Sequence, residues 1–356
     1  MTRSVDFKYR VLRGGAVFGE LHASPDASAP ILRMDDSAEI KTSLAGTFYP
    51  DVTDADGYAV EADWLSDEIQ PVLIVDGVEH ALGVFMPSTV TPWTIEAAQT
   101  VRIEAFDRCW RVRDTYITSR VYFAASTPYL TAIESLLTLA GVTFAFATPT
   151  SAVLAEDREG WEPGTSALAI VNELLREINY NELWFDASGA AILEPASSPT
   201  VDNIEHTLDA DDVESLVVPQ ISRETDVYSA PNVFLCLCSN PDKSGPMTAT
   251  AENNNPQSPL SIPRRGRRIV SVVQLNNVAD QTTLQAYAER LRNESLIGGE
   301  TIRIQTALLP GFGVADVVAL HYGDLAALCI ERAYTMELRV GGTMSHELER
   351  VVYNLG

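Results

Sequence analysis

The feature that most constrains the fold is a change of hydrophobic period between Val101 and Val142. Over residues 101–109 apolar and polar residues alternate, which is the period-2 pattern of a strand with one buried face. Ser-Thr-Pro at 126–128 then predicts the start of a helix, because a cap residue followed by proline suits the first turn. The apolar face of that helix is formed by Leu130, Ile133, Leu136, Leu137 and Ala140.

The residues before this change, 1–120, have the pattern of an antiparallel β-domain. At least six alternating or apolar runs are separated by turns every eight to twelve residues. The clearest hairpin signal is Asp76-Gly77, between the apolar run 72–75 and its return strand 80–85. Because this spacing is typical of an antiparallel sandwich or barrel, we predict a first β-barrel domain over 1–120.

Residues 121–204 have the pattern of a small α/β insert domain. The helix over 127–140 is followed by an apolar, strand-like run at 142–147. Thr165 or Ser166 then fits the cap of a second helix with its own apolar face. A hairpin around Ser188-Gly189 is expected to close the domain.

Strands return over 205–356, which we predict to be a second β-barrel domain. A polar segment at 239–268, rich in asparagine and proline, is expected to be a loop excursion. A further helix is expected over 280–293, closed by Gly298-Gly299, and Gly341-Gly342 predicts a late hairpin. The fold class is therefore α+β, mainly β: two tube-like antiparallel β-barrel domains with a small α/β insert and one further helix.

Charge and hydropathy limit the partners. The chain carries 25 Lys and Arg against 49 Asp and Glu, a formal net charge of −24. Such a surface repels nucleic acid, because phosphate binding needs clustered basic side chains. The chain contains no run of about 18 apolar residues, and residues 1–10 lack the apolar core of a secretory signal. We therefore expect neither a membrane partner nor Sec-type export.

The four cysteines are expected to be buried thiols in a reducing compartment. Cys236 and Cys238 lie on one face of a predicted strand and could form a metal-binding pair. No second cysteine pair and no histidine at ligand spacing accompanies them, so Cys109, Cys236, Cys238 and Cys329 predict no zinc site.

Other patterns typical of catalytic or metal sites are incomplete. Asp54, Asp56 and Gly57 fit positions of a calcium loop, but Val52 occupies its first ligand position, which favours a solvated turn. Acidic pairs such as Asp211-Asp212 could serve glycoside hydrolysis, yet sequence cannot place two carboxyls across a cleft. The five histidines are isolated, and none has a triad-like context: His22, His80, His206, His321 and His346. We therefore predict no catalytic, cofactor or metal residues, and no enzyme.

The basic residues Arg264, Arg265, Arg267 and Arg268 form the one dense basic cluster of the sequence. In so acidic a chain they could bind an acidic partner or another copy of the same chain. The alternative is the solvated flank of a loop. Nucleic-acid binding is disfavoured because no aromatic residues alternate with the arginines.

The order of these patterns resembles the phage tail baseplate hub proteins. The residues that carry the resemblance are Ile74 to Asp76-Gly77 with Leu82 to Phe85, Ile103 to Asp107, Tyr129 to Gly141, Tyr287 to Leu291, and the tail from Leu309-Pro-Gly311 through Tyr334 to Glu349. The resemblance covers nearly the whole chain in order. It implies a structural virion protein, synthesised in the host cytoplasm and assembled into a tail tip or baseplate.

The resemblance also implies partners. Hub proteins of this kind form a homotrimer whose two barrels per chain match a hexameric tail tube. The expected partners are the tail tube or distal tail protein, the tape measure protein, and a spike or fibre protein. Three copies would carry −72 in total, so DNA would pass through their channel without specific binding.

A carbohydrate-binding, receptor-binding baseplate protein is the alternative function. It would need an exposed aromatic platform, for which the candidates are Trp64, Trp93, Trp110, Trp161 and Trp184. We expect these tryptophans to lie mainly in the core.

Overall fold

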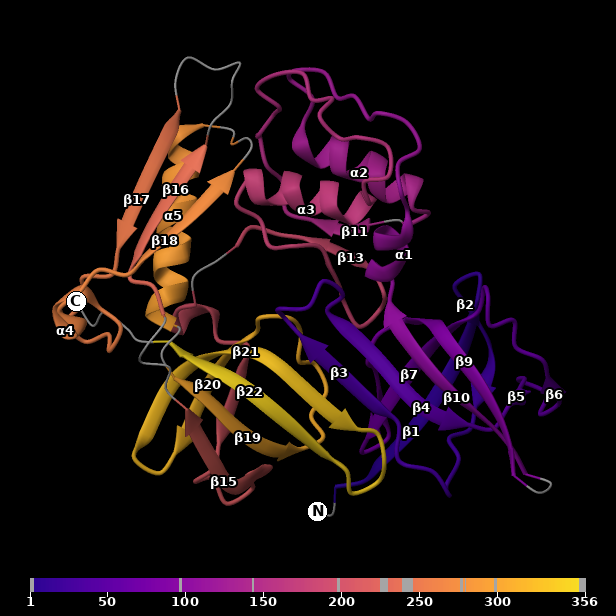
Figure 1. Cartoon of the computed structure of the whole chain (residues 1–356). Coiled ribbons are helices and arrows are strands. Elements are labelled where there is room, and N and C mark those ends of the chain that lie inside the picture. The colour runs from indigo at the N-terminus through magenta and orange to yellow at the C-terminus, as the bar shows by residue number, and fades with distance from the viewer. Residues whose placement is uncertain are drawn as a thin grey trace.

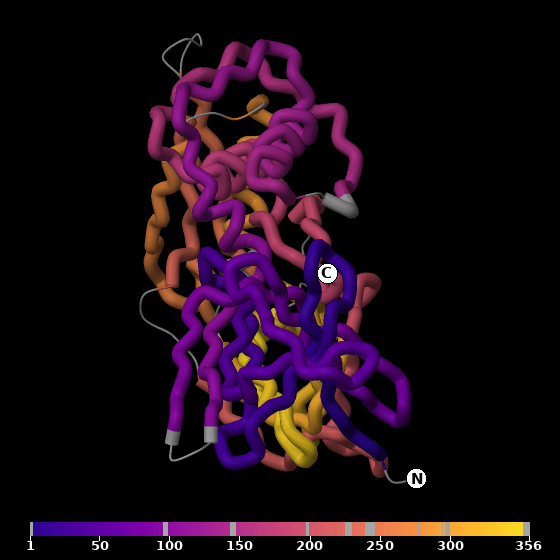
Figure 2. The backbone as a smooth tube through the Cα atoms, turned by 90° about the vertical axis from the view of Figure 1, so that its right-hand side faces the viewer, coloured from indigo at the N-terminus to yellow at the C-terminus, as the bar shows by residue number. Residues whose placement is uncertain are grey.

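The computed structural model describes residues 3–351 except 96–97, 143, 197–198, 225–229, 239–245, 276–277, 279 and 298–299. The molecule has two layers (Figure 1). A broad layer of strands contains both ends of the described chain, and two separate α/β units lie side by side above it. The side view in Figure 2 shows both α/β units on the same side of the strand layer.

The first β-unit confirms the strand pattern at the start of the sequence. Its strands are β1 (Val5–Arg13), β2 (Ala16–Leu21), β3 (Ile31–Asp35), β4 (Thr42–Phe48), β5 (Val52–Thr53), β6 (Ala59–Val60), β7 (Glu68–Val75), β8 (Val78–Ala81), β9 (Phe85–Ile95) and β10 (Ala98–Asp107). The β7–β8 hairpin turns at Asp76 and Gly77, both of which have positive φ, as a tight two-residue turn requires. Buried Phe48, Ile69 and Phe85 fill its core.

The second β-unit contains most of the later strands. They are β14 (His206–Asp209), β15 (Val217–Glu224), β19 (Thr301–Ala307), β20 (Val317–Tyr322), β21 (Leu325–Glu337) and β22 (Thr343–Val351). The expected hairpin at Gly341-Gly342 joins β21 to β22. Apolar residues on alternate positions, among them Ile302, Ile304 and Leu348, form its core.

The two β-units are not two closed barrels, which corrects that part of the expected fold. Strand β3 of the first unit pairs with β4 on one side and with β21 of the second unit on the other. Both units therefore belong to one 16-stranded sheet, which is antiparallel except where β14 pairs with β20. The strand edges expected to close two barrels instead meet each other.

The α/β unit expected after residue 120 is present and begins earlier. It contains α1 (Cys109–Asp114), α2 (Tyr129–Leu139), β11 (Phe144–Ala147), α3 (Ala167–Glu177), β12 (Trp184–Phe185), β13 (Ala191–Leu193) and the short helix η1 (Val201–Asn203). Cys109 begins a helix instead of extending the strand, and it lies in this unit's core. Of the two candidate caps for α3, Ser166 accepts the hydrogen bond, from the Ala169 N–H.

A second α/β unit includes part of the expected loop excursion at 239–268, of which residues 239–245 lie outside the described residues. Its elements are β16 (Val233–Cys238), β17 (Met247–Glu252), α4 (Ile262–Arg265), β18 (Val270–Leu275) and α5 (Gln281–Ile297). The strands form a sheet of their own, in the order β17-β16-β18, separate from the large sheet. Helix α5 is the further helix expected over 280–293 and runs longer, while its expected glycine closure at 298–299 lies outside the described residues.

Candidate assembly surfaces

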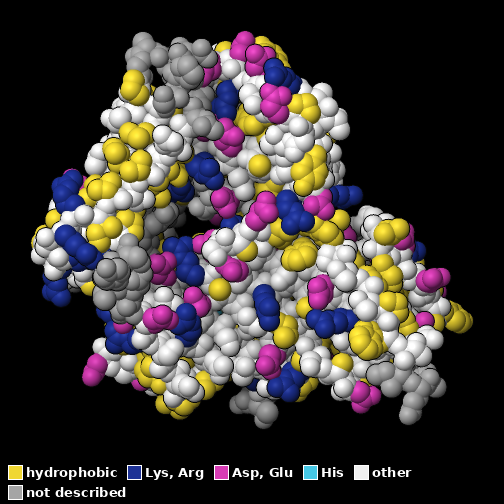
Figure 3. Space-filling model, viewed as in Figure 1, with side chains coloured by type: hydrophobic (Ala, Val, Ile, Leu, Met, Phe, Trp, Pro, Cys, Tyr) yellow, Lys and Arg dark blue, Asp and Glu magenta, His cyan; other side chains and the backbone are white. Residues whose placement is uncertain are grey.

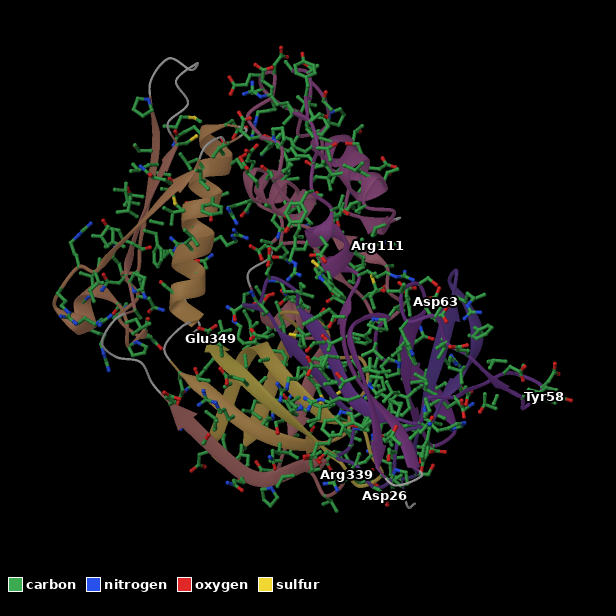
Figure 4. The ribbon with its side chains drawn as sticks, turned by 45° about the vertical axis from the view of Figure 1, so that its right-hand side comes forward. Asp26, Tyr58, Asp63, Arg111, Arg339 and Glu349 are labelled. Atoms are coloured by element: carbon green, nitrogen blue, oxygen red, sulfur yellow. The ribbon has the colours of Figure 1, made fainter. Side chains whose placement is uncertain are left out.

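The contact between the two β-units is held by Arg332 as well as by the β3–β21 pairing. Arg332 lies at a register shift of β21, and its guanidinium contacts Asp36 and Glu349, each at 2.6 Å. The three side chains are each at least two-thirds buried, so these ion pairs are partly shielded from water. Figure 4 shows Glu349 where the large sheet approaches α5.

The first α/β unit is fixed to the first β-unit by charged and steric contacts. Arg108 binds both carboxylate oxygens of Glu68, at 2.6 and 2.8 Å, and also donates to the Gly189 carbonyl at 2.8 Å. Gly189 has φ +77°, and a Cβ there would lie 2.8 Å from the side chain of Val84. The hairpin at 188–189 therefore docks through a position that only glycine fits.

A cavity of about 990 Å³ lies where the two α/β units meet both β-units. Figure 3 shows a deep opening between the two α/β units and the layer of strands below them. Its walls carry paired charges: Lys41 contacts Glu182 at 3.0 Å, and Arg176 contacts the same carboxylate at 3.5 Å. These charges already pair with one another within the chain. We therefore interpret the cavity as a junction between the units of the chain.

One side-chain cluster was missed by sequence reasoning because its members are far apart in the chain. His346 Nε2 lies 3.0 Å from Thr306 Oγ1, and His346 Nδ1 lies 2.6 Å from Glu331 Oε2. The register of β19, β21 and β22 brings the three together. This hydroxyl–imidazole–carboxylate order is that of a nucleophilic triad.

The proton positions do not suit that chemistry. Thr306 Oγ1 donates to the Ala307 carbonyl at 2.7 Å, so His346 Nε2 must carry the proton that bonds Thr306. An imidazole protonated at Nε2 cannot take a proton from the hydroxyl. All three residues are also almost fully buried, which leaves a substrate no access. The cluster is a buried hydrogen-bond network of the core.

The basic cluster has a defined structure. Arg264 and Arg265 end α4, whose cap residues are Ser261 and the left-handed Gly266. Buried Asn232 fixes the surrounding backbone, since its side chain bonds the Leu260 and Arg267 carbonyls and the Ile269 N–H. Arg264, Arg267 and Arg268 are exposed, whereas Arg265 is half-buried, and Arg268 contacts Glu252 at 2.5 Å. The lone asparagine at position 232 gave no recognisable sign of this role.

Among the described residues, no helix packs on one face of the small sheet beside this cluster. On its covered face, buried Cys236 and Cys238 pack with Leu284 and Ala288 of α5. On the other face, Val270 and Val272 are 52% and 57% exposed, beside half-buried Leu235 and Leu237. We call this uncovered face, together with residues 264–268, the basic face.

The expected turn at Asp54–Gly57 lies in a projecting hairpin. Residues 51–63, which we call the acidic arm, include β5 and β6 and carry five acidic residues and no basic residue. Asp54 accepts hydrogen bonds from the Asp56 and Tyr58 N–H groups, which is the bonding of a polar turn. Tyr58 is 70% exposed and points outward from the tip (Figure 4).

The tryptophans do not form a shared platform. Trp161 is buried, Trp64, Trp110 and Trp184 are half-buried, and Trp93 is 56% exposed. All four cysteines are buried. Within the described residues, no group of three His, Cys, Asp or Glu side chains is placed to hold a metal, and no helix is both long and apolar enough to cross a membrane.

No family model matches the chain, and no curated protein matches it by sequence. Solved structures do match. A tail protein from Neisseria meningitidis is 12% identical, with 97% of this chain and 96% of that chain covered and a TM-score of 0.64. The 43 kDa tail protein of prophage MuSo2 from Shewanella oneidensis is 11% identical, with coverages of 97% and 98% and a TM-score of 0.63.

A third structure extends the likeness to secretion systems. It is an Escherichia coli component of the type VI secretion system, described as structurally similar to the bacteriophage T4 tail proteins gp27 and gp5. It is 10% identical to this chain, with coverages of 99% and 77% and a TM-score of 0.54. The chain therefore has the fold of phage tail baseplate hub proteins.

Proposed function

We propose that this protein is the structural hub of a phage-type tail tip or baseplate. The observation that carries the proposal is the extent of the fold match, 97% of this chain and 96% of the Neisseria tail protein. A match of that extent includes both β-units and both α/β units. We therefore assign the function to the whole arrangement of β-units and α/β units, and not to a single pocket.

In the proposed assembly three copies form a ring in the virion tail. Each copy contributes two β-units side by side, so three copies present six, which suits a hexameric tail tube or distal tail protein above. A spike or fibre protein binds below, and the tape measure protein ends at the ring. The charge of −24 per copy supports a channel through which DNA passes without binding.

The proposed role is non-enzymatic. The most triad-like cluster of the described residues, Thr306, His346 and Glu331, is closed to substrates and has the wrong proton arrangement, which supports this part of the proposal.

Native mass measurement combined with negative-stain imaging, over a range of protein concentrations, tests the proposal. The expected result is a threefold ring with a central opening. A protein that stays monomeric at high concentration and binds a glycan on an array would contradict it, and would favour the carbohydrate-binding alternative. Because some rings close only on their partners, chemical cross-linking before the mass measurement is included to retain weak contacts.

A further inference from the structure

The charge of the chain is unevenly distributed between its two ends. Residues 230–297, which contain the basic face, carry seven Lys and Arg against five Asp and Glu, a net charge of +2. The rest of the chain therefore carries −26. Within it, residues 1–107 carry seven basic against eighteen acidic residues, a net charge of −11, and include the acidic arm.

These two surfaces lie at opposite ends of the molecule. Figure 1 shows α4 at one edge and the β5–β6 hairpin at the other, and Figure 4 shows the same separation from a turned view. Two complementary surfaces at opposite ends of one molecule cannot contact each other within that molecule. They can contact each other between two copies, in a head-to-tail arrangement.

The two surfaces also complement each other in their apolar parts. The acidic arm presents the exposed Tyr58 ring, and Leu65 just after the arm is 97% exposed. The basic face presents Val270 and Val272 beside the arginines. An apolar centre surrounded by opposite charges is the usual composition of a specific protein contact.

We propose that the acidic arm of one copy binds the basic face of the next copy. This inference rests on the proposed hub function and names the surfaces by which its copies join. A head-to-tail contact of this kind closes into a ring when its rotation divides a full turn, and gives open filaments when it does not. The opposite charges orient the encounter, while the apolar residues exclude water from the contact.

Site-specific cross-linking tests the contact. The natural cysteines are buried, so a bismaleimide reagent will join cysteines introduced at exposed positions. In Ala55→Cys/Val270→Cys, one cysteine lies at the arm tip and the other on the basic face. The expected result is a ladder of covalent multimers, several-fold stronger than in the matched control Ala55→Cys/Thr138→Cys, whose second cysteine lies at an exposed position of α2. Equal ladders in the two proteins would overturn the inference.

Charge reversal provides a second and independent readout. Arg264→Glu/Arg268→Glu, added to the cross-linking pair, should abolish the ladder. Adding Asp51→Arg/Asp56→Arg to the same chain should restore it, because the charges are again opposite. A misfolded protein would not be rescued in this way, so failure of the second reversal to restore the ladder counts against the contact.

Imaging of the same samples separates this inference from the hub proposal. A threefold ring without the arm-to-face ladder would leave the hub proposal standing and overturn the contact. A ladder whose products are open chains, with no ring at any concentration, would support the contact and contradict the hub.

Discussion

Glu177 is a buried carboxyl whose titration should be measurable in the stability of the protein. It accepts from Arg158 at 2.7 and 2.8 Å and from the Tyr129 hydroxyl at 2.8 Å. Burial is the largest influence on it and raises the pKa of Glu177 from 4.5 to about 7, although Arg158 acts in the opposite direction. At a pH between 4.5 and about 7, Glu177 therefore keeps its proton in the folded protein but has lost it in the unfolded chain.

The free energy of unfolding should therefore fall as pH rises from 5 to 7, by up to about 3 kcal/mol from this group. Glu177→Gln keeps a carbonyl acceptor for Arg158 and removes this titration, so over this range its free energy of unfolding should fall by up to about 3 kcal/mol less than that of the wild type. Urea unfolding at several pH values measures the difference. Glu162→Gln, at an exposed ion pair with Arg120, is the control and should keep the wild-type slope. A slope in Glu177→Gln equal to the wild-type slope would contradict the assignment.

The His346–Glu331 pair makes a second prediction at the residue scale. Both side chains are fully buried, and burial raises the pKa of Glu331. His346→Leu leaves this carboxyl buried without its partner, so we expect a loss of about 3–5 kcal/mol in the free energy of unfolding. The double change His346→Leu/Glu331→Met should recover most of the loss, because two apolar side chains then fill the same space.

Denaturant unfolding of the single and double variants provides the measurement. The control is His321→Leu at an exposed position, which should change stability little. A double variant no more stable than His346→Leu would show that the pair is not the source of the loss.

At the scale of elements, the connection between β3 and β21 decides whether the β-units unfold together. Arg332→Met removes the ion pair with Asp36, which joins the two β-units, and the ion pair with Glu349, which lies within the second unit, and it keeps most of the buried stem. We expect a loss of about 2 kcal/mol, between the values for exposed and buried pairs, and a thermal transition that separates into two steps. Differential scanning calorimetry measures both effects.

Arg339→Met is the matched control for that change. Arg339 pairs with Glu337 at the surface, is 63% exposed, and lies far from Glu349 in Figure 4. Its loss should cost no more than about 0.5 kcal/mol and leave a single transition. If Arg332→Met also keeps a single transition, the strand pairing alone couples the two β-units.

At the scale of the whole molecule, the net charge of −24 predicts how the protein behaves towards DNA. Duplex DNA should show no mobility shift at about 0.15 M salt, because phosphates are repelled by most of the surface and the basic face is small. Electrophoretic mobility assays measure this, with the Asp51→Arg/Asp56→Arg protein as a control for charge. A salt-sensitive shift with the unmodified protein would contradict a channel that DNA passes without binding.

Local patterns were sufficient to predict many elements. The turns at Asp76-Gly77 and Gly341-Gly342, the helices α2, α3 and α5, and the hairpin at Ser188-Gly189 each depend on residues close together in the chain. The sequence order also indicated the hub fold, which the solved structures confirm. Signals of this kind are readable because a turn or a cap acts over a few residues.

Other features depend on residues far apart, so only the tertiary structure decided them. Nothing local indicates that β3 pairs with β21, and that pairing makes one sheet of the two expected barrels. The polar residues 253–268 have the composition of a loop, and their backbone is fixed by Asn232, whose side chain bonds backbone groups up to 37 positions away. The acidic residues of 51–63 and the arginines of 264–268 are both charge runs in the sequence. Their places at opposite ends of the molecule follow only from the packing of the units between them.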